Sequence, residues 1–326
     1  MEQRPVTISY IAASAGVSVP TVSKVLNGRA GVAADTRTRV EALIAELGYR
    51  KPVSPVRSRL LELVFEDLHH AWGTEIIRGV EQVARRHRLG VVLSEFGPDH
   101  STIRYWIEDA LARRPACVVT VAQLTERERQ RLRQQGIPCV VLDPTAELPD
   151  GVPFIGATNW AGGRAATRHL IGLGHTRIGM VAGPDDVLCC RARLDGYHAA
   201  LASAGLPPLI VHAALTSEDG TRAARSLLAE GVTAIFACND LQALGVYAAA
   251  RTAGLRIPAD LSVVGFDDLP VVAHVDPPLT TVHQPLIEMA IAATEMALAL
   301  GRGESPAQLG FELATSLTVR GSTQNA

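Results

Sequence analysis

Residues 6–28, VTISYIAASAGVSVPTVSKVLNG, predict two short helices joined by a tight turn. Apolar residues recur at helical spacing in the first half, and Gly16 is free to adopt the positive φ that such a turn requires. Ser18 stands at an expected N-cap, and a proline follows in the first turn, where its missing N–H does no harm. The side chains predicted to face outward from the second helix are Val19, Pro20, Ser23, Lys24 and Asn27. Two such helices form the helix-turn-helix unit, whose second helix enters a DNA major groove.

A third helix is predicted over residues 35–47, because Val40, Leu43, Ile44 and Leu47 recur on one face and can complete a three-helix core. Residues 1–59 hold nine Lys and Arg against four Asp and Glu, a net charge of +5, so the remainder of a chain of net charge −2 carries −7. A small basic domain ahead of an acidic one suits an anionic polymer as partner. The pattern alone also allows an ordinary helical hairpin packed into a larger domain.

Residues 6–49, which end in VEALIAELGY, resemble the headpiece of the lactose-repressor (LacI/GalR) family of bacterial transcription regulators. Glycine, serine, threonine, valine and asparagine fall at the family's spacing throughout this stretch. The resemblance implies that Val19, Pro20 and Lys24 read base edges, which carry the sequence information. It also implies a second group of positions that contact phosphates or cap helices, namely Thr7, Ser18, Thr21, Ser23, Asn27 and Thr36.

Three positions depart from the family's usual pattern. Lys24 replaces a common arginine, so a bidentate contact with guanine is replaced by the contact of a single point charge. Tyr10 stands where an acidic residue often closes a capping box, and Ala33 occupies a usual Ser/Thr N-cap, for which Asp35 compensates through the helix dipole. We expect DNA binding to survive these changes and the preferred operator sequence to differ.

The sequence predicts a DNA-binding domain over residues 1–50, a short linker over 51–59, and an effector-binding and dimerisation domain over 60–326. Two prolines within four residues of the linker oppose regular helix. Family members usually have a longer segment here, which forms a hinge helix and inserts an apolar wedge into the minor groove. The shorter linker of this chain offers Val56 as a candidate for such a wedge, and Leu60 is predicted to begin the next strand.

From residue 60 onward, strand-like runs alternate with helical segments. The runs are LLELVF, VVLSEF, CVVTVA and CVVLD, then RIGMVAG, LIVHAAL, AIFACND and LSVVGFDD. This alternation predicts two similar α/β lobes of parallel sheet flanked by helices. GRAATRHLIGLGH, RLDGY and IPADLSVVGFDD resemble the family's sugar-binding core, whose fold is that of periplasmic binding proteins. We place the N-terminal lobe at about 60–156 and 285–313, and the C-terminal lobe at about 157–284 and 314–326.

Polar side chains follow several of the predicted strands, where ligands of such folds bind. Carboxylates, amides and an arginine beside an indole suit a polyhydroxylated ring. The resemblance implies effector contacts at Trp72, Asp143, Arg193, Asn239, Asp267 and Gln284, and further candidates are Asp67, Trp160 and His70. For Asp240 and Asp268 we expect the commoner role of helix N-cap, and for His175 a structural role.

No enzyme motif is present: the sequence lacks G-x-x-x-x-G-K-S/T, G-x-G-x-x-G, G-x-S-x-G and H-E-x-x-H. Lysine occurs only at positions 24 and 51, so the core has no lysine for a Schiff base or a phosphate. The strand-end acids could form a glycosidase pair, but in a non-catalytic binding-protein cleft they grip hydroxyls. No metal or cofactor is expected. Five scattered cysteines and the absence of a signal peptide or an apolar run of membrane-spanning length indicate a reducing cytoplasm.

These observations predict a cytoplasmic, homodimeric transcription regulator, a repressor of carbohydrate-utilisation genes that binds a near-palindromic operator. A sugar or oligosaccharide in the cleft between the lobes is expected to change the angle between them. The chain ends without an apolar heptad repeat, so no tetramerisation helix is expected. The alternative is a sugar-binding sensor whose basic head contacts a protein partner rather than DNA.

Overall fold

A computed structural model describes residues 8–26, 31–47, 58–68, 71–97 and 103–326. The chain divides into two compact units, Met1–Arg57 and Ser58–Ala326. Several predicted positions lie outside the described residues: Thr7, Asn27, Val56 and His70. None of the described helices combines the length and apolar character needed to cross a bilayer.

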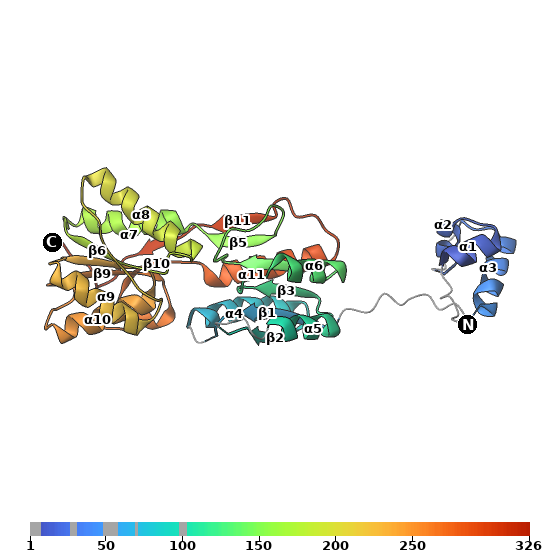
Figure 1. Cartoon of the computed structure of the whole chain (residues 1–326), viewed down its shortest axis with the longest axis horizontal. Helices are drawn as coiled ribbons and strands as arrows, with labels where there is room; N and C mark the ends of the chain where they lie inside the picture. The colour runs from blue at the N-terminus through green and yellow to red at the C-terminus, as the bar shows by residue number, and fades with distance from the viewer. Residues whose placement is uncertain (1–7, 27–30, 48–57, 69–70, 98–102) are drawn as a thin grey trace. The chain divides into compact units, whose positions relative to one another are not determined.

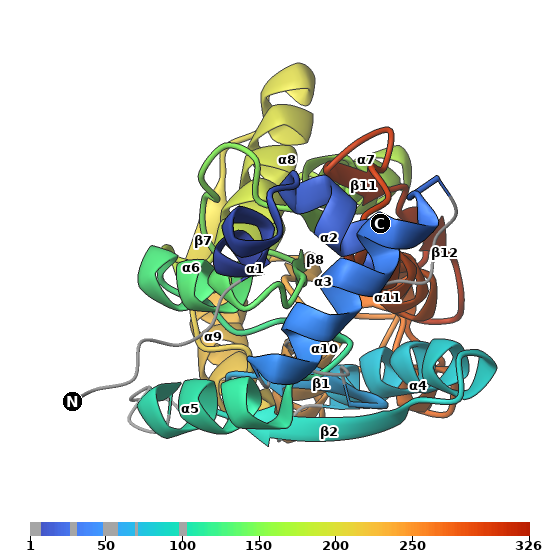
Figure 2. The ribbon, with the colours of Figure 1, turned by 90° about the vertical axis from the view of Figure 1, so that its right-hand side faces the viewer.

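Three helices make up the described part of the first unit (Figure 2): α1 (Ile8–Ala15), α2 (Val19–Leu26) and α3 (Ala34–Glu46). Their common core contains Ile11, Val22 and Val40, each fully buried. Apolar residues at helical spacing therefore form the inner faces, as the sequence pattern predicted.

The turn between α1 and α2 has the predicted local chemistry. Gly16 adopts φ +65°, a conformation that costs glycine little. Ser18 Oγ accepts a hydrogen bond from the Thr21 backbone N–H at 3.3 Å, so the N-cap prediction is confirmed. Ala33 precedes α3 without a side-chain cap, which leaves Asp35 as the acidic residue of the first turn.

Two six-stranded sheets form the second unit (Figure 1). The first sheet is parallel throughout, in the order β11-β5-β4-β3-β1-β2. The second has the order β12-β10-β9-β8-β6-β7 and is parallel except that β12 runs antiparallel to β10. The strands of the first sheet are β1 (Leu60–Phe65), β2 (Gly90–Glu95), β3 (Cys117–Thr120), β4 (Cys139–Leu142), β5 (Phe154–Ala157) and β11 (Gly310–Leu313). Those of the second are β6 (Ile178–Ala182), β7 (Leu209–His212), β8 (Ala234–Ala237), β9 (Ser262–Asp267), β10 (Thr280–His283) and β12 (Ser316–Thr318).

Helices cover both faces of each sheet, and each face has its own apolar core. On the first sheet, α4 (Ala71–Arg86) and α11 (Leu286–Gly301) cover one face, and α5 (Ile103–Arg113) and α6 (Glu126–Gln134) the other. On the second, α7 (Asn159–Gly172) and α8 (Leu188–Ala204) oppose α9 (Ser217–Ala229) and α10 (Asp240–Thr252). A short 3-10 helix, η1 (Pro270–Ala273), follows β9. This is the predicted two-lobed, periplasmic-binding-protein-like α/β architecture.

The chain passes between the two sheets after β5, after β10 and after β11. Each lobe is therefore assembled from separate stretches of sequence (Figure 1). The crossings after β5 and β11 lie side by side, where Thr158 Oγ1 accepts a hydrogen bond from the Thr315 backbone N–H at 2.9 Å. The sequence patterns did not predict β5, β10, β11 or β12. Three of these strands contain polar residues (TTVH, GFEL and SLT) and β5 contains a glycine (FIGA), so none of them stands out as a continuous apolar run.

Candidate functional site

A cavity of about 370 Å³ lies between the two lobes of the second unit, at the carboxyl ends of the strands. The first lobe contributes Phe65, Glu66, Asp67, Trp72, Val121, Asp143 and Thr145. The second lobe contributes Val187, Cys189, Arg193, Leu215, Asn239, Leu241, Asp267 and Leu269. Polar groups from two opposing sides and an indole thus meet around one space.

Six predicted effector positions line this cavity, namely Asp67, Trp72, Asp143, Arg193, Asn239 and Asp267. Gln284 is instead buried behind it, at 1% exposure, and contacts the lining residues rather than the space. Trp160 lines a neighbouring cavity, and its side chain is 47% exposed. The sequence prediction therefore identified the polar lining but not the depth at which Gln284 lies.

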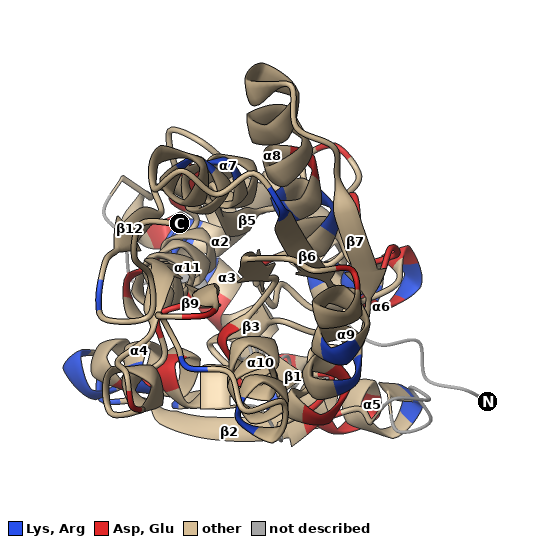
Figure 3. Ribbon diagram, turned by 90° about the vertical axis from the view of Figure 1, so that its left-hand side faces the viewer, with Lys and Arg blue, Asp and Glu red and all other residues tan. Residues whose placement is uncertain are grey.

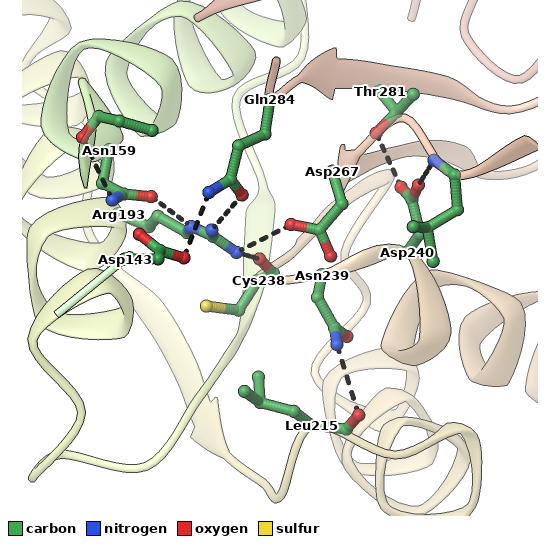
Figure 4. A network of polar contacts seen from close by, with 12 residues as sticks. Asp143, Asn159, Arg193, Leu215, Cys238, Asn239, Asp240, Asp267, Thr281 and Gln284 are labelled. Carbon is green, nitrogen blue, oxygen red and sulfur yellow. Dashed lines mark hydrogen bonds and ion pairs between the residues drawn. The ribbon is translucent and has the colours of Figure 1, made fainter. Parts of the chain in front are cut away.

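Arg193 is the centre of the polar network (Figure 4). It projects from α8, is 3% exposed and donates from three nitrogens: Nε to Asn159 Oδ1 at 2.9 Å, Nη1 to the Cys238 carbonyl at 2.7 Å and Nη2 to Gln284 Oε1 at 3.0 Å. Its guanidinium carbon lies 3.6 Å from the centroid of the Phe266 ring. These contacts hold the guanidinium in one orientation, which is the preorganisation that a binding site needs.

Two carboxylates lie on either side of this guanidinium. Asp267 Oδ1 is 3.4 Å from Arg193 Nη1, and Asp143 Oδ2 accepts a hydrogen bond from Gln284 Nε2 at 3.1 Å. The backbones of Asp143 and Asp267 have φ of +51° and +110°, in the region that side-chain-bearing residues rarely adopt. Such strain concentrates at functional sites, because it aims a side chain in a direction that relaxed backbone does not provide.

Burial raises the pKa of Asp143, and the nearby Arg193 charge and the Gln284 hydrogen bond oppose that rise. Burial likewise raises the pKa of Asp267 well above its ordinary value, against the attraction of Arg193. Two buried carboxyl groups with raised pKa values in one cavity mark a candidate binding site.

Asn239 both lines the cavity and caps a helix. Its Oδ1 accepts from the Gln242 backbone N–H at 2.9 Å and so provides the N-cap of α10, while its Nδ2 donates to the Leu215 carbonyl at 3.2 Å. Because these bonds engage both ends of the amide, Asn239 also fixes the position of the Leu215 segment in the cavity wall.

The predicted N-cap roles of Asp240 and Asp268 are wrong. Asp240 lies within α10, fully buried, and accepts from the Leu269 backbone N–H at 2.8 Å and from Thr281 Oγ1 at 2.6 Å. Asp268 accepts from Arg320 Nη2 at 2.6 Å, and the next helix begins only after Leu269. The physical reason is that Asn239 already occupies the cap of α10, so Asp240 is free to bond across to the β9–β10 region.

Sequence reasoning missed two parts of the site. Asn159, which orients Arg193, carried no signal except its place at the start of α7, directly after the chain leaves the first sheet. The apolar wall of Val187, Leu215, Leu241 and Leu269 was also missed, although the last two residues directly follow predicted polar strand ends. His175, by contrast, has the predicted structural role: it is buried and bonded to Thr233 at 2.9 Å.

All five cysteines are free thiols. Within the described ranges, no group of three or more His, Cys, Asp or Glu side chains is arranged to hold a metal ion.

The first unit presents the predicted DNA-facing positions of α2 on its surface. Val19, Pro20 and Lys24 are exposed, and Ser23 is half-buried. Thr21 and Thr36, predicted to contact phosphates or cap helices, are half-buried, and Ser18 is exposed with its hydroxyl 2.9 Å from that of Thr21. One side of α2 is thus available to a partner while its other side, with Val22 and Val25, forms core.

Comparison with known proteins defines the class. Residues 7–51 match the family described as "Bacterial regulatory proteins, lacI family", and residues 167–323 match the "Periplasmic binding protein-like domain". The chain belongs to the LacI family, as its sequence predicted, and is a DNA-binding transcriptional regulator rather than an enzyme.

Individual relatives are similar over nearly their whole length. The HTH-type transcriptional regulator MalR of Streptomyces coelicolor is 37% identical over 98% of this chain and 97% of its own. The HTH-type transcriptional repressor CytR of Escherichia coli K12 is 30% identical, over 99% and 98%. Among solved structures, the transcriptional regulator CelR–cellobiose complex has a TM-score of 0.72 at 32% identity, covering 97% of this chain and 99% of that one. The Lac repressor dimer bound to operator and the anti-inducer ONPF has a TM-score of 0.72 at 29% identity, covering 98% and 100%.

Proposed function

We propose that this protein represses carbohydrate-utilisation genes by binding, as a homodimer, to a near-palindromic operator, and that a sugar in the interlobe cavity controls this binding. The observation that carries the proposal is the polar network of Asp143, Arg193 and Asp267, which lines one cavity together with Trp72. Carboxylates and a guanidinium bond sugar hydroxyls, and an indole packs against the C–H face of the ring.

The relatives support both halves of the proposal. CelR has been solved with cellobiose, and the Lac repressor has been solved as a dimer on its operator. In a dimer of this kind two heads meet two half-sites, so the symmetry of the operator mirrors that of the protein. Because operator DNA lies in the bacterial cytoplasm, the proposed function also places the protein there.

At the DNA, we assign base-edge reading to Val19, Pro20 and Lys24, and phosphate contacts or helix capping to the remaining predicted head residues. Lys24 presents one exposed ammonium group, which suits a single contact rather than a two-pronged one. The proposed assignment predicts that changing Lys24 alters operator preference, whereas changing a phosphate contact weakens binding to all sequences alike.

Control by sugar requires that the ligand prefer one arrangement of the lobes. Gln284 links Asp143 of the first lobe to Arg193 of the second, so a sugar that bonds to these groups acts on both lobes together. The coupling is reciprocal: a sugar that weakens operator binding must itself bind more weakly to the operator complex.

The DNA half is tested by selecting binding sites from random duplex DNA and titrating salt against the selected site. A head that neutralises ~6–10 phosphates should lose ~10³-fold or more in affinity over a fourfold rise in salt. A nearly salt-independent interaction, or no selected sequence, would instead support a sensor whose head contacts protein.

The effector half is tested by thermal unfolding in the presence of neutral mono- and oligosaccharides. A sugar that binds only the folded protein must raise Tm in proportion to the logarithm of its concentration. Sedimentation as monomer alone, with and without the selected DNA, would contradict the two-headed arrangement.

A further inference from the structure

A backbone hydrogen bond joins the two lobes at one wall of the cavity around Arg193. The Leu188 N–H donates to the Thr145 carbonyl at 2.7 Å. Thr145 lies in the segment that follows β4 of the first lobe, and Leu188 is the first residue of α8 in the second lobe. The bond therefore forms only while the lobes lie close together on this side.

The two segments that this bond joins, 143–145 and 187–189, form a wall between two cavities. Thr145 and Val187 line the cavity around Arg193, whereas Pro144 and Leu188 line the neighbouring cavity of about 710 Å³. Separation of the segments would therefore remove part of the wall that encloses the space beside Arg193.

The helix that begins at this wall has no side-chain cap of its own. At the starts of α6, α9 and α10, the side chains of Thr125, Thr216 and Asn239 accept hydrogen bonds, but the N-cap of α8 is Val187, whose side chain cannot. The first turn of α8 also lacks an acidic residue, coloured red in Figure 3, to stabilise the positive end of the helix dipole. Because the first N–H groups of a helix have no acceptor within it, the Thr145 carbonyl of the other lobe supplies one.

The same helix carries Arg193, which is tied to the same segment of the first lobe. Arg193 Nη2 donates to Gln284 Oε1 at 3.0 Å, and Gln284 Nε2 donates to Asp143 Oδ2 at 3.1 Å. The segment 143–145 thus holds α8 at two points, directly at Leu188 and through Gln284 at Arg193. The position of Arg193 in the cavity depends on both contacts.

We propose that the Thr145–Leu188 hydrogen bond is a latch that holds the lobes closed around a bound effector, and that the effector leaves when this bond breaks. The proposal rests on the proposed sugar control and concerns the regulation of that same cavity. Closure gives the first N–H of α8 its acceptor and completes the cavity wall, whereas opening returns donor and acceptor to water. A ligand that bonds to both lobes favours closure and is in turn retained by the latch.

Leu188→Pro removes the latch with little effect on α8 itself. Proline is favoured at the first position of a helix, where its missing N–H makes no bond within the helix. The preceding residue, Val187, has φ −93° and ψ 114°, in the extended region that a following proline favours. The proline ring also takes the place of the lost hydrogen and keeps the Thr145 carbonyl away. Leu188→Ala is the matched control, because it removes the same side chain and retains the N–H.

Hydrogen exchange of the full chain without ligand tests whether the latch forms. Relative to their rates in unfolded peptides, the Leu188 N–H should exchange about 10-fold or more slowly than that of Ser217, the exposed first residue of α9. Equal protection of the two amides would show that the lobes are not latched in solution, and the proposal would be wrong whatever sugars bind.

Calorimetric titration with glucose, maltose and cellobiose tests the retention of an effector. A sugar that binds the native protein should bind Leu188→Pro about 10-fold more weakly than Leu188→Ala, because one hydrogen bond is lost. Stopped-flow displacement should show that the difference lies in the dissociation rate. Equal affinities of the two variants would overturn the latch and leave sugar control standing. If no sugar of this series or of the thermal screen binds the native protein, sugar control itself fails and the effector role of the latch fails with it, although slow exchange at Leu188 would still show that the lobes are joined there.

Discussion

Gln284 Nε2 donates to Asp143 Oδ2 at 3.1 Å, and this hydrogen bond joins the two lobes. Asp143 directly follows β4 of the first sheet, and Gln284 directly follows β10 of the second. Gln284 Oε1 also accepts a hydrogen bond from Arg193 Nη2 (Figure 4). The side chain that orients Arg193 is therefore also bonded to the other lobe. A rotation of one lobe against the other must change these bonds, which couples lobe arrangement to cavity chemistry.

Replacing Gln284 with leucine should lower the free energy of unfolding by about 1–3 kcal/mol, because Asp143 and Arg193 each lose a buried hydrogen-bond partner. Urea unfolding measures the change. Gln134→Leu, at an exposed position of α6, is the control and should stay within about 0.5 kcal/mol of the original protein. Equal stability of the two variants would show that the interlobe bond contributes nothing to folding.

The contribution of Asp240 to stability should fall as pH rises from about 4 to 7. Burial raises the pKa of Asp240 to about 7, against the hydrogen bonds from Thr281 and Leu269, whereas the unfolded chain releases this proton near 3.8. Between these values the folded protein holds more protons than the unfolded chain, so the free energy of unfolding declines by at most about 1.4 kcal/mol per pH unit for this one group.

Asp240→Asn should therefore flatten the pH dependence of urea unfolding between pH 4 and 7. Other buried groups still contribute to the slope: burial raises the pKa of Asp143 and Asp267, which acts in the same direction, and lowers the pKa of His169 and His175, which acts in the opposite direction. The control is Asp260→Asn, whose carboxylate is exposed and paired with Arg256, an interaction that lowers its pKa to about 2. An unchanged slope in Asp240→Asn would contradict the assignment of the buried proton.

Two glycines of α7 should respond oppositely to alanine. A Cβ on Gly163 would lie 2.2 Å from the Arg193 carbonyl oxygen, so Gly163→Ala must push α8 away and should cost about 1–3 kcal/mol of stability. A Cβ on Gly172 meets nothing within 4 Å, so Gly172→Ala should gain about 0.5–1 kcal/mol from reduced chain entropy. Thermal unfolding compares the pair. If Gly163→Ala proves as stable as Gly172→Ala, close α7–α8 packing does not hold Arg193 in place.

On the proposed DNA contacts, Lys24→Ala should weaken binding to the selected operator by about 10-fold or more, since a base-edge contact is lost. Lys24→Arg should shift preference toward guanine at the contacted position. Arg39→Ala removes an equal charge from the exposed surface of α3 and serves as the control. Fluorescence anisotropy of labelled operator at constant salt measures the affinity of the Lys24→Ala and Arg39→Ala variants for comparison. Equal losses in Lys24→Ala and Arg39→Ala would mean that net charge matters and position does not.

Residue preferences for turns, helix caps and apolar strands correctly predicted features that depend on neighbouring residues in the sequence. The α1–α2 turn follows from Gly16 and Ser18, and β1 begins at Leu60 as its apolar run indicated. The same rules failed where two residues competed for one role: Asn239 caps α10, and Asp240 is drawn into bonds with Thr281 and Leu269, far away in sequence. A preference for caps describes a residue type, whereas the position of the helix start and of its tertiary neighbours decides which residue takes the cap.

The sequence by itself determined the three-helix head, the alternation that makes two α/β lobes, and the polar residues gathered at strand ends. These depend on periodicity, caps and the direction of parallel strands, all of which are written in short stretches of chain. Only the tertiary structure decided that Gln284 lies buried between the lobes and that Asp143 borders two cavities. It also decided that Trp160 lines the neighbouring cavity and not the cavity around Arg193. Those placements depend on the three chain crossings between the lobes, which bring residues more than a hundred positions apart, such as Asp143 and Gln284, into contact. A pattern within a short stretch of sequence does not specify such contacts.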